Sequence, residues 1–553
     1  MNTRDFLDGK SFDGYKFFGA HKKDKGYIFR VLAPNAEKVS IIGDFNDWQK
    51  QSMRKYSTGV FSITIDKAKV GDTYQYVISS GDKEVKKIDP FAKSIIYDEI
   101  SSQIVDDSYK YKYKYKGKKN LPNNILQVYL GTLFNNKEKT ADEIYRDIIT
   151  HAKENSYTSI LLMPINEYQN YKSLGYSSLS LFSFSKRYGD IKSFRKFVDE
   201  CHKEKLQVIV ELDISEFDPD LCGLSDFDGT DLYNYKYEDI YFNYYEQANF
   251  DISGPVSKSY IKSAVDYNLN DYNLDGIYFS SIENSIYWQG DVARGINKNW
   301  VDFIKEINDY IVSKGAVSLA SFNGIYEMDL GFSCAFDFKS KTLINMLKDE
   351  PYKRDYYKNY ITDLIKNSDS NGILGFSYVD SYQNEANLAM KIYSDDKKLD
   401  QLKTLFLFLF SLKSPKLLFM GDDCGDLRTF SQYQIFNFDG KSDKIPGLND
   451  FYRDISKLYL DTDILSHPLS KTELLDVEGY SLYAYKRTYK NKSYLVVVNF
   501  TDIDYQIESS FNLDELINTQ DLSYSGSGNI NGNISKGDTI NIEAYSSAIF
   551  KIK

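Results

Sequence analysis

The stretch Leu-Asp-Gly-Ile-Tyr-Phe-Ser-Ser at residues 274–281 decides how the rest of the chain is interpreted. An apolar and aromatic run follows a glycine and leads into two serines, which is typical of a buried strand that ends at a polar edge. The segment before it, 259–272, has the apolar spacing of a helix. A helix followed by a short buried strand is one step of a β/α repeat, so we expect residues 276–279 to belong to a parallel sheet.

The same alternation extends on both sides of this stretch. Short apolar segments alternate with longer amphipathic ones from residue 125 to about residue 418, which is the pattern of a (β/α)8 barrel. The eight expected strands are residues 125–130, 159–163, 207–212, 276–279, 316–319, 334–336, 373–376 and 416–419. The predicted fold class is therefore α/β, a (β/α)8 TIM barrel.

The segments before and after the predicted barrel have a different hydrophobic pattern. Short alternating segments at 27–31, 39–42, 61–65 and 74–78, and again at 480–485 and 494–501, predict a β-sandwich on each side. We predict an N-terminal β-sandwich at 1–108, a linker at 109–124, the barrel at 125–462 and a C-terminal β-sandwich at 463–553. The linker begins with alternating tyrosines and lysines, from Tyr109 to Lys116, and a strand at a domain seam is the alternative interpretation.

Composition limits the classes of partner. The chain has 68 Lys and Arg against 79 Asp and Glu, a net charge of −11, which argues against a nucleic acid or an anionic membrane as its main partner. We find neither a signal peptide at the start nor a run of about 18 apolar residues, and therefore expect no membrane span. The 4 cysteines lack metal-type spacing, so we expect a reduced, cytoplasmic setting and no cofactor or metal.

Several motifs follow one another in a recognisable order. They are FRVLAPNA at 29–36, GDFNDW at 43–48, DPFA at 89–92, LLMPINE at 161–167, FDGTDLY at 227–233, DGIYFS at 275–280 and KLLFMG at 416–421. Together they resemble the α-amylase superfamily (glycoside hydrolase family 13), in particular bacterial glycogen branching enzymes with an N-terminal family 48 carbohydrate-binding module. The resemblance implies a barrel that acts on α-glucan through two catalytic carboxylates at strand ends.

The places that the resemblance assigns to those carboxylates hold other residues here. Ser280 occupies the place of the nucleophile, Ser321 that of the acid/base and Val379 that of the third carboxylate, with Asp380 one position later. Tyrosines replace an arginine and two histidines of the family at Tyr129, Tyr278 and Tyr378. A neutral hydroxyl neither stabilises an oxocarbenium ion nor protonates a leaving oxygen at neutral pH. The sequence therefore predicts that the catalytic residues of the family are lost.

Sugar binding does not need those carboxylates. Tyr176 and Trp288 are candidates for stacking on sugar rings in the barrel cleft, Trp48 in the N-terminal module, and Asp380 for a polar contact. An open groove with aromatic walls would favour binding of glycogen or maltooligosaccharides. If instead the three tyrosines fill the former sugar site, a structural or partner role is favoured, because a cavity lined by apolar and aromatic atoms tends to close.

Three hypotheses follow. The first is a catalytically degenerate homologue of branching enzyme that binds α-glucan. The second is an active 1,4-α-glucan branching enzyme that uses relocated carboxylates, for which the acids near strand ends are Asp213, Glu216, Glu283, Asp380, Asp422 and Asp423. The third is an inactive subunit that pairs with a protein partner in glycogen metabolism.

Overall fold

The structure is a computed structural model that describes residues 2–115, 121–321, 329–337, 339–381, 386–438, 440 and 444–553. The chain divides into two compact units. Unit 1 consists of Met1–Asn120, Tyr129–Tyr145 and Leu162–Ser333. Unit 2 consists of Leu121–Val128, Arg146–Leu161 and Cys334–Lys553.

Eight parallel strands form a closed barrel in chain order. They are β11 (Asn124–Val128), β12 (Ser159–Leu162), β13 (Gln207–Glu211), β16 (Gly276–Phe279), β17 (Val317–Ala320), β18 (Cys334–Phe336), β19 (Gly372–Phe376) and β20 (Lys416–Phe419). All eight lie within two residues of their expected positions, because strands buried on both faces are continuous apolar runs that stand out in a sequence. The predicted TIM barrel is confirmed.

Strand β16 lies between β13 and β17 in unit 1. It forms the central part of the stretch 274–281, from which the barrel was predicted. Gly276 is opposite Val317, and a Cβ atom added to Gly276 would come within 2.6 Å of the Val317 carbonyl oxygen. A larger residue would push the strands apart, so the glycine is required by close packing. Just before the strand, the Asp275 carboxylate lies 2.9 Å from Nε2 of His202 and accepts a hydrogen bond from the Val208 backbone N–H.

Helices surround these strands. In unit 1 they are α1 (Thr3–Leu7), α2 (Leu130–Phe134), α4 (Ile191–Lys203), α5 (Glu238–Tyr241), α6 (Pro255–Asp266), α7 (Glu283–Ile286) and α8 (Lys298–Ser313). In unit 2 they are α9 (Lys339–Lys348), α10 (Lys358–Asn367), α11 (Leu388–Lys391), α12 (Lys398–Ser411), α13 (Leu448–Asp461) and α14 (Asp463–Ser466), and α3 (Ala141–Glu154) has residues in both units. Helix α6 starts with proline, which suits the first helical position because that residue needs no N–H partner.

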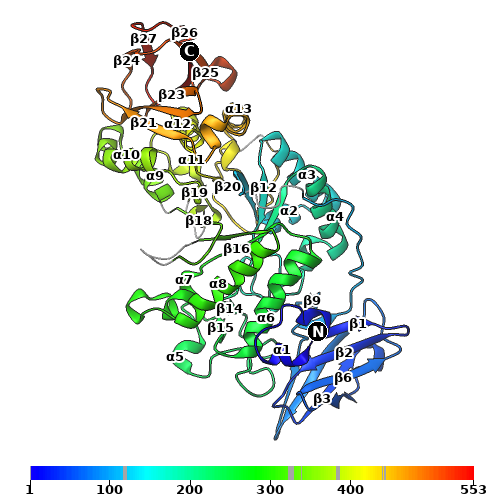
Figure 1. Cartoon of the computed structure of the whole chain (residues 1–553). Helices are drawn as coiled ribbons and strands as arrows, with labels where there is room; N and C mark the ends of the chain where they lie inside the picture. Colours follow the sequence, from blue (N-terminus) through cyan, green and yellow to red (C-terminus); the bar gives the residue numbers. More distant parts are fainter. Residues whose placement is uncertain are drawn as a thin grey trace. The chain divides into compact units, whose positions relative to one another are not determined.

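The N-terminal part of unit 1 is built from two antiparallel sheets (Figure 1). One has the order β1-β2-β6-β5 and the other β4-β3-β7-β10-β9, with β8 paired to β7. Their bounds are β1 (Gly19–Lys22), β2 (Tyr27–Leu32), β3 (Lys38–Gly43), β4 (Gln51–Ser52), β5 (Arg54–Lys55), β6 (Val60–Ile65), β7 (Thr73–Ser80), β8 (Lys83–Lys87), β9 (Ile95–Ile96) and β10 (Ser101–Gln103). The alternation seen in the sequence thus corresponds to a sandwich with a buried interior.

The tyrosine and lysine run after this sandwich is anchored to α4. The hydroxyl of Tyr109 donates to the Asp199 carboxylate at 3.2 Å, and the backbone N–H groups of Lys112 and Tyr113 donate to the same carboxylate. The lysine side chains between the tyrosines are exposed. Part of the predicted linker, residues 116–120, lies outside the described residues, and β11 begins at Asn124.

The C-terminal part of unit 2 is all β. One sheet has the order β21-β22-β23-β28-β25-β26, and β24 pairs with β27. Their bounds are β21 (Lys471–Leu475), β22 (Leu482–Tyr489), β23 (Lys492–Asn499), β24 (Tyr505–Glu508), β25 (Leu513–Asn518), β26 (Asn533–Ile534), β27 (Thr539–Ile542) and β28 (Ser547–Ile552). Buried residues such as Val497 and Phe550 form its core. Among the described residues, no helix has the length and apolar character needed to cross a membrane.

Candidate functional site

The two serines at the carboxylate places lie side by side in unit 1. Phe279, at the end of β16, is opposite Ala320, at the end of β17, so the next residues Ser280 and Ser321 emerge at the same end of the barrel. The backbone N–H of Ser321 donates to the carbonyl of Phe279 at 3.1 Å, which holds the two strand ends together. The structure therefore brings together the two places that the sequence assigned to nucleophile and acid/base.

Each serine has a distinct environment. Ser280 is 8% exposed, and its Oγ has no hydrogen-bond partner among the described residues. Ser321 Oγ donates to Oε2 of Glu283 at 3.1 Å. The loop that follows Ser321 cannot be compared with the sequence prediction, because residues 322–328 lie outside the described part of the chain.

Carboxylates other than the expected ones gather at the end of β13. Glu211 is 1% exposed and accepts a hydrogen bond of 2.6 Å from the Tyr176 hydroxyl. Asp213 accepts from the backbone N–H and the hydroxyl of Ser215, at 2.8 and 2.5 Å. Glu216 accepts from the side-chain amide of Asn243. Burial therefore makes the ionised forms of Asp213 and Glu216 costly.

Burial shifts the titration of this group. It raises the pKa of Asp213 to about 6, with Glu283 adding to the rise and the bonds from Ser215 opposing it. Burial and the neighbouring Asp213 raise the pKa of Glu216 well above its ordinary value. Two close carboxyls cannot both ionise easily, so this pair retains a proton at higher pH than isolated carboxyls do.

The place of the family's early-strand histidine is filled by buried aromatic rings in unit 1. Tyr129 is wholly buried, and its hydroxyl lies 3.3 Å from that of Tyr168, which in turn lies 3.2 Å from that of Tyr188. Arg187 stacks over the Tyr168 ring and pairs with the buried Glu167. Tyr278, in the place of the arginine, is 6% exposed. Two of the three replacing tyrosines are therefore part of the interior.

The third carboxylate's place lies in unit 2, directly after β19. Tyr378 is partly buried, and its backbone N–H donates to the side chain of Gln127 at 2.9 Å, while Val379 is exposed. Asp380 accepts from the Ser377 N–H at 2.9 Å. Asp380 does not continue β19 with strand geometry, since Tyr378–Ser381 form a 3-10 helix, η9, in which side chains do not alternate as they do along a strand.

The remaining acidic candidates in unit 2 have structural surroundings. Asp423 is fully buried, lies 2.6 Å from Nε2 of His151 and accepts from the Tyr157 hydroxyl. Burial acts to raise its pKa, but these two partners outweigh burial and lower it. Burial, together with Asp380 and Asp423, raises the pKa of Asp422 well above its ordinary value. Asp423 is thus committed to internal contacts with His151 and Tyr157.

The aromatic candidates differ in exposure. Trp48 is 37% exposed, and its indole N–H donates to Asp44 at 3.0 Å, which orients the ring. Trp288 is half-buried, begins the 3-10 helix η6 (Trp288–Gly290) and lies 6.1 Å from the ring of Tyr235. Tyr176 is also half-buried. In the described residues, no group of three or more His, Cys, Asp or Glu is arranged to hold a metal ion.

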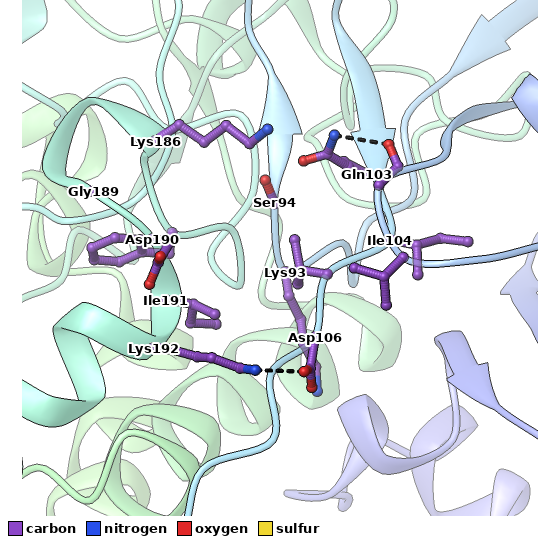
Figure 2. Close-up of a pocket in the computed structure, with 14 residues that line it drawn as sticks. Lys93, Ser94, Gln103, Ile104, Asp106, Lys186, Gly189, Asp190, Ile191 and Lys192 are labelled. Atoms are coloured by element: carbon purple, nitrogen blue, oxygen red, sulfur yellow. Dashed lines mark hydrogen bonds and ion pairs between the residues drawn. The ribbon is translucent and has the colours of Figure 1, made fainter.

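A separate cavity of about 390 Å³ lies in unit 1, between residues of the N-terminal sandwich and the start of α4 (Figure 2). Lys186 extends towards Ser94 and Gln103, and Lys192 pairs with Asp106 on the other side. Its lining includes none of the site residues predicted from the sequence.

Comparison with known proteins fits this architecture. Residues 17–92 match carbohydrate-binding module 48 (isoamylase N-terminal domain), and residues 475–553 match the alpha amylase C-terminal all-beta domain. The catalytic module of the glycogen-degrading pneumococcal virulence factor SpuA superposes with a TM-score of 0.76 at 16% identity, covering 100% of this chain and 99% of that one. The chain therefore shares the fold of that module, and its two flanking parts match these two family models.

Relatives resemble the chain over almost its entire length. The 1,4-alpha-glucan branching enzyme GlgB of Clostridium perfringens is 27% identical over 95% of this chain and 89% of that enzyme. The 1,4-alpha-glucan branching enzyme GlgB of Francisella tularensis subsp. novicida is 27% identical over 95% and 91%. The predicted resemblance to glycogen branching enzymes with a family 48 module is confirmed.

Proposed function

We propose that the chain is a catalytically inactive relative of glycogen branching enzymes that binds α-glucan. The observation that carries this proposal is Ser280, a buried hydroxyl with no hydrogen-bond partner among the described residues, in the place of the nucleophile. Ser321, in the place of the acid/base, adds a second neutral group. Retaining glycosidases need two carboxyls at these positions, and their catalytic groups act as a unit.

The similarity to other proteins supports α-glucan as the ligand. The relatives are named for an action on 1,4-alpha-glucan, and residues 17–92 match a carbohydrate-binding module. Trp48, exposed on that module with its ring oriented by Asp44, offers one surface for stacking on a sugar ring. Tyr176, Trp288 and Asp380 are proposed as further contacts. The protein partner in glycogen metabolism and the cytoplasmic setting stay predictions.

Two measurements on the full-length chain test the proposal. Purified protein is incubated with amylose, and new α-1,6 linkages are counted by proton NMR; we expect none. Mobility is then compared in native gels with and without glycogen, where we expect retardation by glycogen. New branches would overturn the inactive assignment, and unchanged mobility would overturn glucan binding.

A second candidate function has its own supporting observation. Burial raises the pKa of Asp213 to about 6, a value suited to a general acid near neutral pH, and Glu283 contacts Ser321 at 3.1 Å. An active branching enzyme using these relocated carboxyls would form α-1,6 linkages, and both Asp213→Asn and Glu283→Gln would abolish them. The same NMR experiment therefore separates the two candidates.

A further inference from the structure

A strongly aromatic segment of unit 1 projects into solvent. Residues 235–247, with the sequence YKYEDIYFNYYEQ, contain six Tyr or Phe among 13 residues. Tyr244 is 89% exposed, Tyr237 67%, Tyr245 63% and Phe242 46%. Aromatic side chains normally bury much of their surface, and a contiguous exposed group of them marks an interaction site.

The backbone that presents these rings is well ordered by hydrogen bonds. Asn243 and Gln247 are joined by a backbone hydrogen bond of 2.9 Å, and Asn243 Oδ1 accepts from the N–H groups of Tyr245 and Gln247 at 2.9 and 3.0 Å. Below them, β14 (Glu216–Phe217) pairs with β15 (Ala248–Asn249). A turn held in this way loses little conformational entropy when a ligand binds to its side chains.

The turn is also joined to the segment that carries Trp288. The side-chain amide of Gln289 donates to the carbonyls of Asp239 and Phe242, at 3.0 and 2.9 Å. Trp288 and Ile240 line the same small hollow. Trp288 therefore lies beside this segment, with its ring 6.1 Å from that of Tyr235, and we call residues 235–247 with Trp288 the aromatic platform.

The aromatic platform is connected to the strand ends that bear the two serines. Asn243, at its turn, donates to Glu216, whose pKa is raised by burial and by Asp213. Glu216 follows the end of β13, and β13 pairs in parallel with β16, the strand that ends just before Ser280. The platform therefore rises from the same end of the barrel as Ser280 and Ser321.

The charged residues of this segment indicate which class of ligand it could bind. Within residues 235–247 the exposed charges are Lys236 against Glu238, Asp239 and Glu246, an excess of two negative charges. Arg294 lies 3.5 Å from Asp239 and offsets one of these charges, so the segment offers little attraction to phosphate-bearing polymers. It suits a neutral polymer whose rings offer apolar C–H faces to tyrosine and whose hydroxyls donate to carboxylates, which is the chemistry of α-glucan.

We propose that the aromatic platform binds an α-1,4-glucan chain by stacking of its sugar rings on Tyr237, Phe242, Tyr244 and Tyr245, next to Trp288. The proposal rests on glucan binding as the proposed function and adds a site to it. Tyr244 and Tyr245 form its most exposed part, with ring centroids 5.3 Å apart and planes at 86°. The two rings are in edge-to-face contact with each other, and their outer faces point in different directions.

The test measures the Kd of maltoheptaose by calorimetry, and retardation in glycogen gels, for the full-length chain. The variant Tyr244→Ala/Tyr245→Ala is expected to raise the Kd about tenfold, the loss of roughly two stacking contacts. Tyr244→Phe/Tyr245→Phe keeps the rings and should stay within about threefold of the original Kd. The matched control is Tyr352→Ala/Tyr356→Ala, two tyrosines of unit 2 that are 74% and 87% exposed, which should leave the Kd unchanged. Circular dichroism checks that each variant is folded.

The outcomes separate this inference from the function on which it rests. If the unmodified chain binds glycogen and the Tyr244→Ala/Tyr245→Ala variant binds equally well, the aromatic platform is not the glucan site and the proposed function stands. If the unmodified chain binds neither maltoheptaose nor glycogen, both are wrong. If glucan affinity is unchanged but the alanine variant loses a protein that co-purifies with the original chain, the platform is a protein interface instead.

Discussion

The Tyr176 hydroxyl donates a hydrogen bond of 2.6 Å to Oε1 of Glu211, the last residue of β13. Glu211 is almost completely buried, whereas the Tyr176 ring is half-exposed. One residue therefore has two separable parts, a hydroxyl that binds an internal carboxylate and a half-exposed ring.

Tyr176→Phe separates these parts. Removal of the hydroxyl takes one donor from a buried carboxylate, so the free energy of unfolding should fall by about 1.5–3 kcal/mol, as measured by urea denaturation. The ring remains, so the Kd of maltoheptaose should stay within about twofold. Tyr176→Ala, which removes both parts, should weaken binding as well. An unchanged stability of Tyr176→Phe would mean that water replaces the phenol at Glu211.

Ser280→Ala should not destabilise the protein. The Ser280 hydroxyl is buried without a hydrogen-bond partner among the described residues, so its removal relieves an unsatisfied polar group. We expect the free energy of unfolding to stay the same or rise by up to about 1 kcal/mol. The matched control is Ser321→Ala, which loses its bond to Glu283 and should cost about 0.5–1.5 kcal/mol. A large loss of stability in Ser280→Ala would show that Ser280 has a partner.

Stability should depend on pH through Asp213. Folding raises the pKa of this carboxyl to about 6, above its ordinary value near 3.9. The folded state therefore holds the proton more tightly, and this contribution is fully present below about pH 4 and lost as the pH rises through about 6.

Asp213→Asn keeps an acceptor for Ser215 but does not titrate. The fall in the free energy of unfolding between pH 4 and pH 7 should then shrink by on the order of 2 kcal/mol. The control is Asp89→Asn in the N-terminal sandwich, because burial raises the pKa of Asp89 to about 6 as well. Each variant should flatten part of the plot of unfolding free energy against pH. Parallel plots for Asp213→Asn and the original chain would contradict a raised pKa at Asp213.

Gly276→Ala tests the packing of β16 against β17. The added methyl group would meet the Val317 carbonyl at 2.6 Å, and backbone atoms cannot move aside cheaply. We expect a loss of about 1–3 kcal/mol in thermal or urea unfolding. Gly372→Ala in β19 is the control, because the nearest atoms to its added Cβ are 3.5 Å away, so it should cost less than about 1 kcal/mol. Equal losses in both variants would contradict a specific clash at Gly276.

The sequence predicted the barrel well because its strands are buried on both faces. Residues 276–279 were expected and found as a strand, and their apolar character has no other simple explanation. The side-by-side placement of Ser280 and Ser321 also followed, since parallel strands end at one edge.

Other features of the site depend on loops, which sequence patterns do not place. The contact between Ser321 and Glu283 joins residues that no periodicity relates, and the helical turn at Asp380 lies beyond the end of the predicted strand. The density of aromatic residues at 235–247 was visible in the composition, but composition does not distinguish an exposed ring from a buried one. Only the side-chain environment identifies Tyr244 and Tyr245 as surface residues.

The linked hydroxyls of Tyr129, Tyr168 and Tyr188 restrict which side chains can be placed at the strand ends of this barrel. Putting carboxylates at residues 280 and 321 would change only two strand ends, while Tyr129 would still fill its position with a completely buried ring. A histidine there would leave a void beside two phenols that now interact with each other. A histidine at residue 129 and carboxylates at residues 280 and 321 therefore require redesign of the surrounding interior as well as of the strand ends, so these substitutions are coupled and cannot be introduced one at a time without loss of packing.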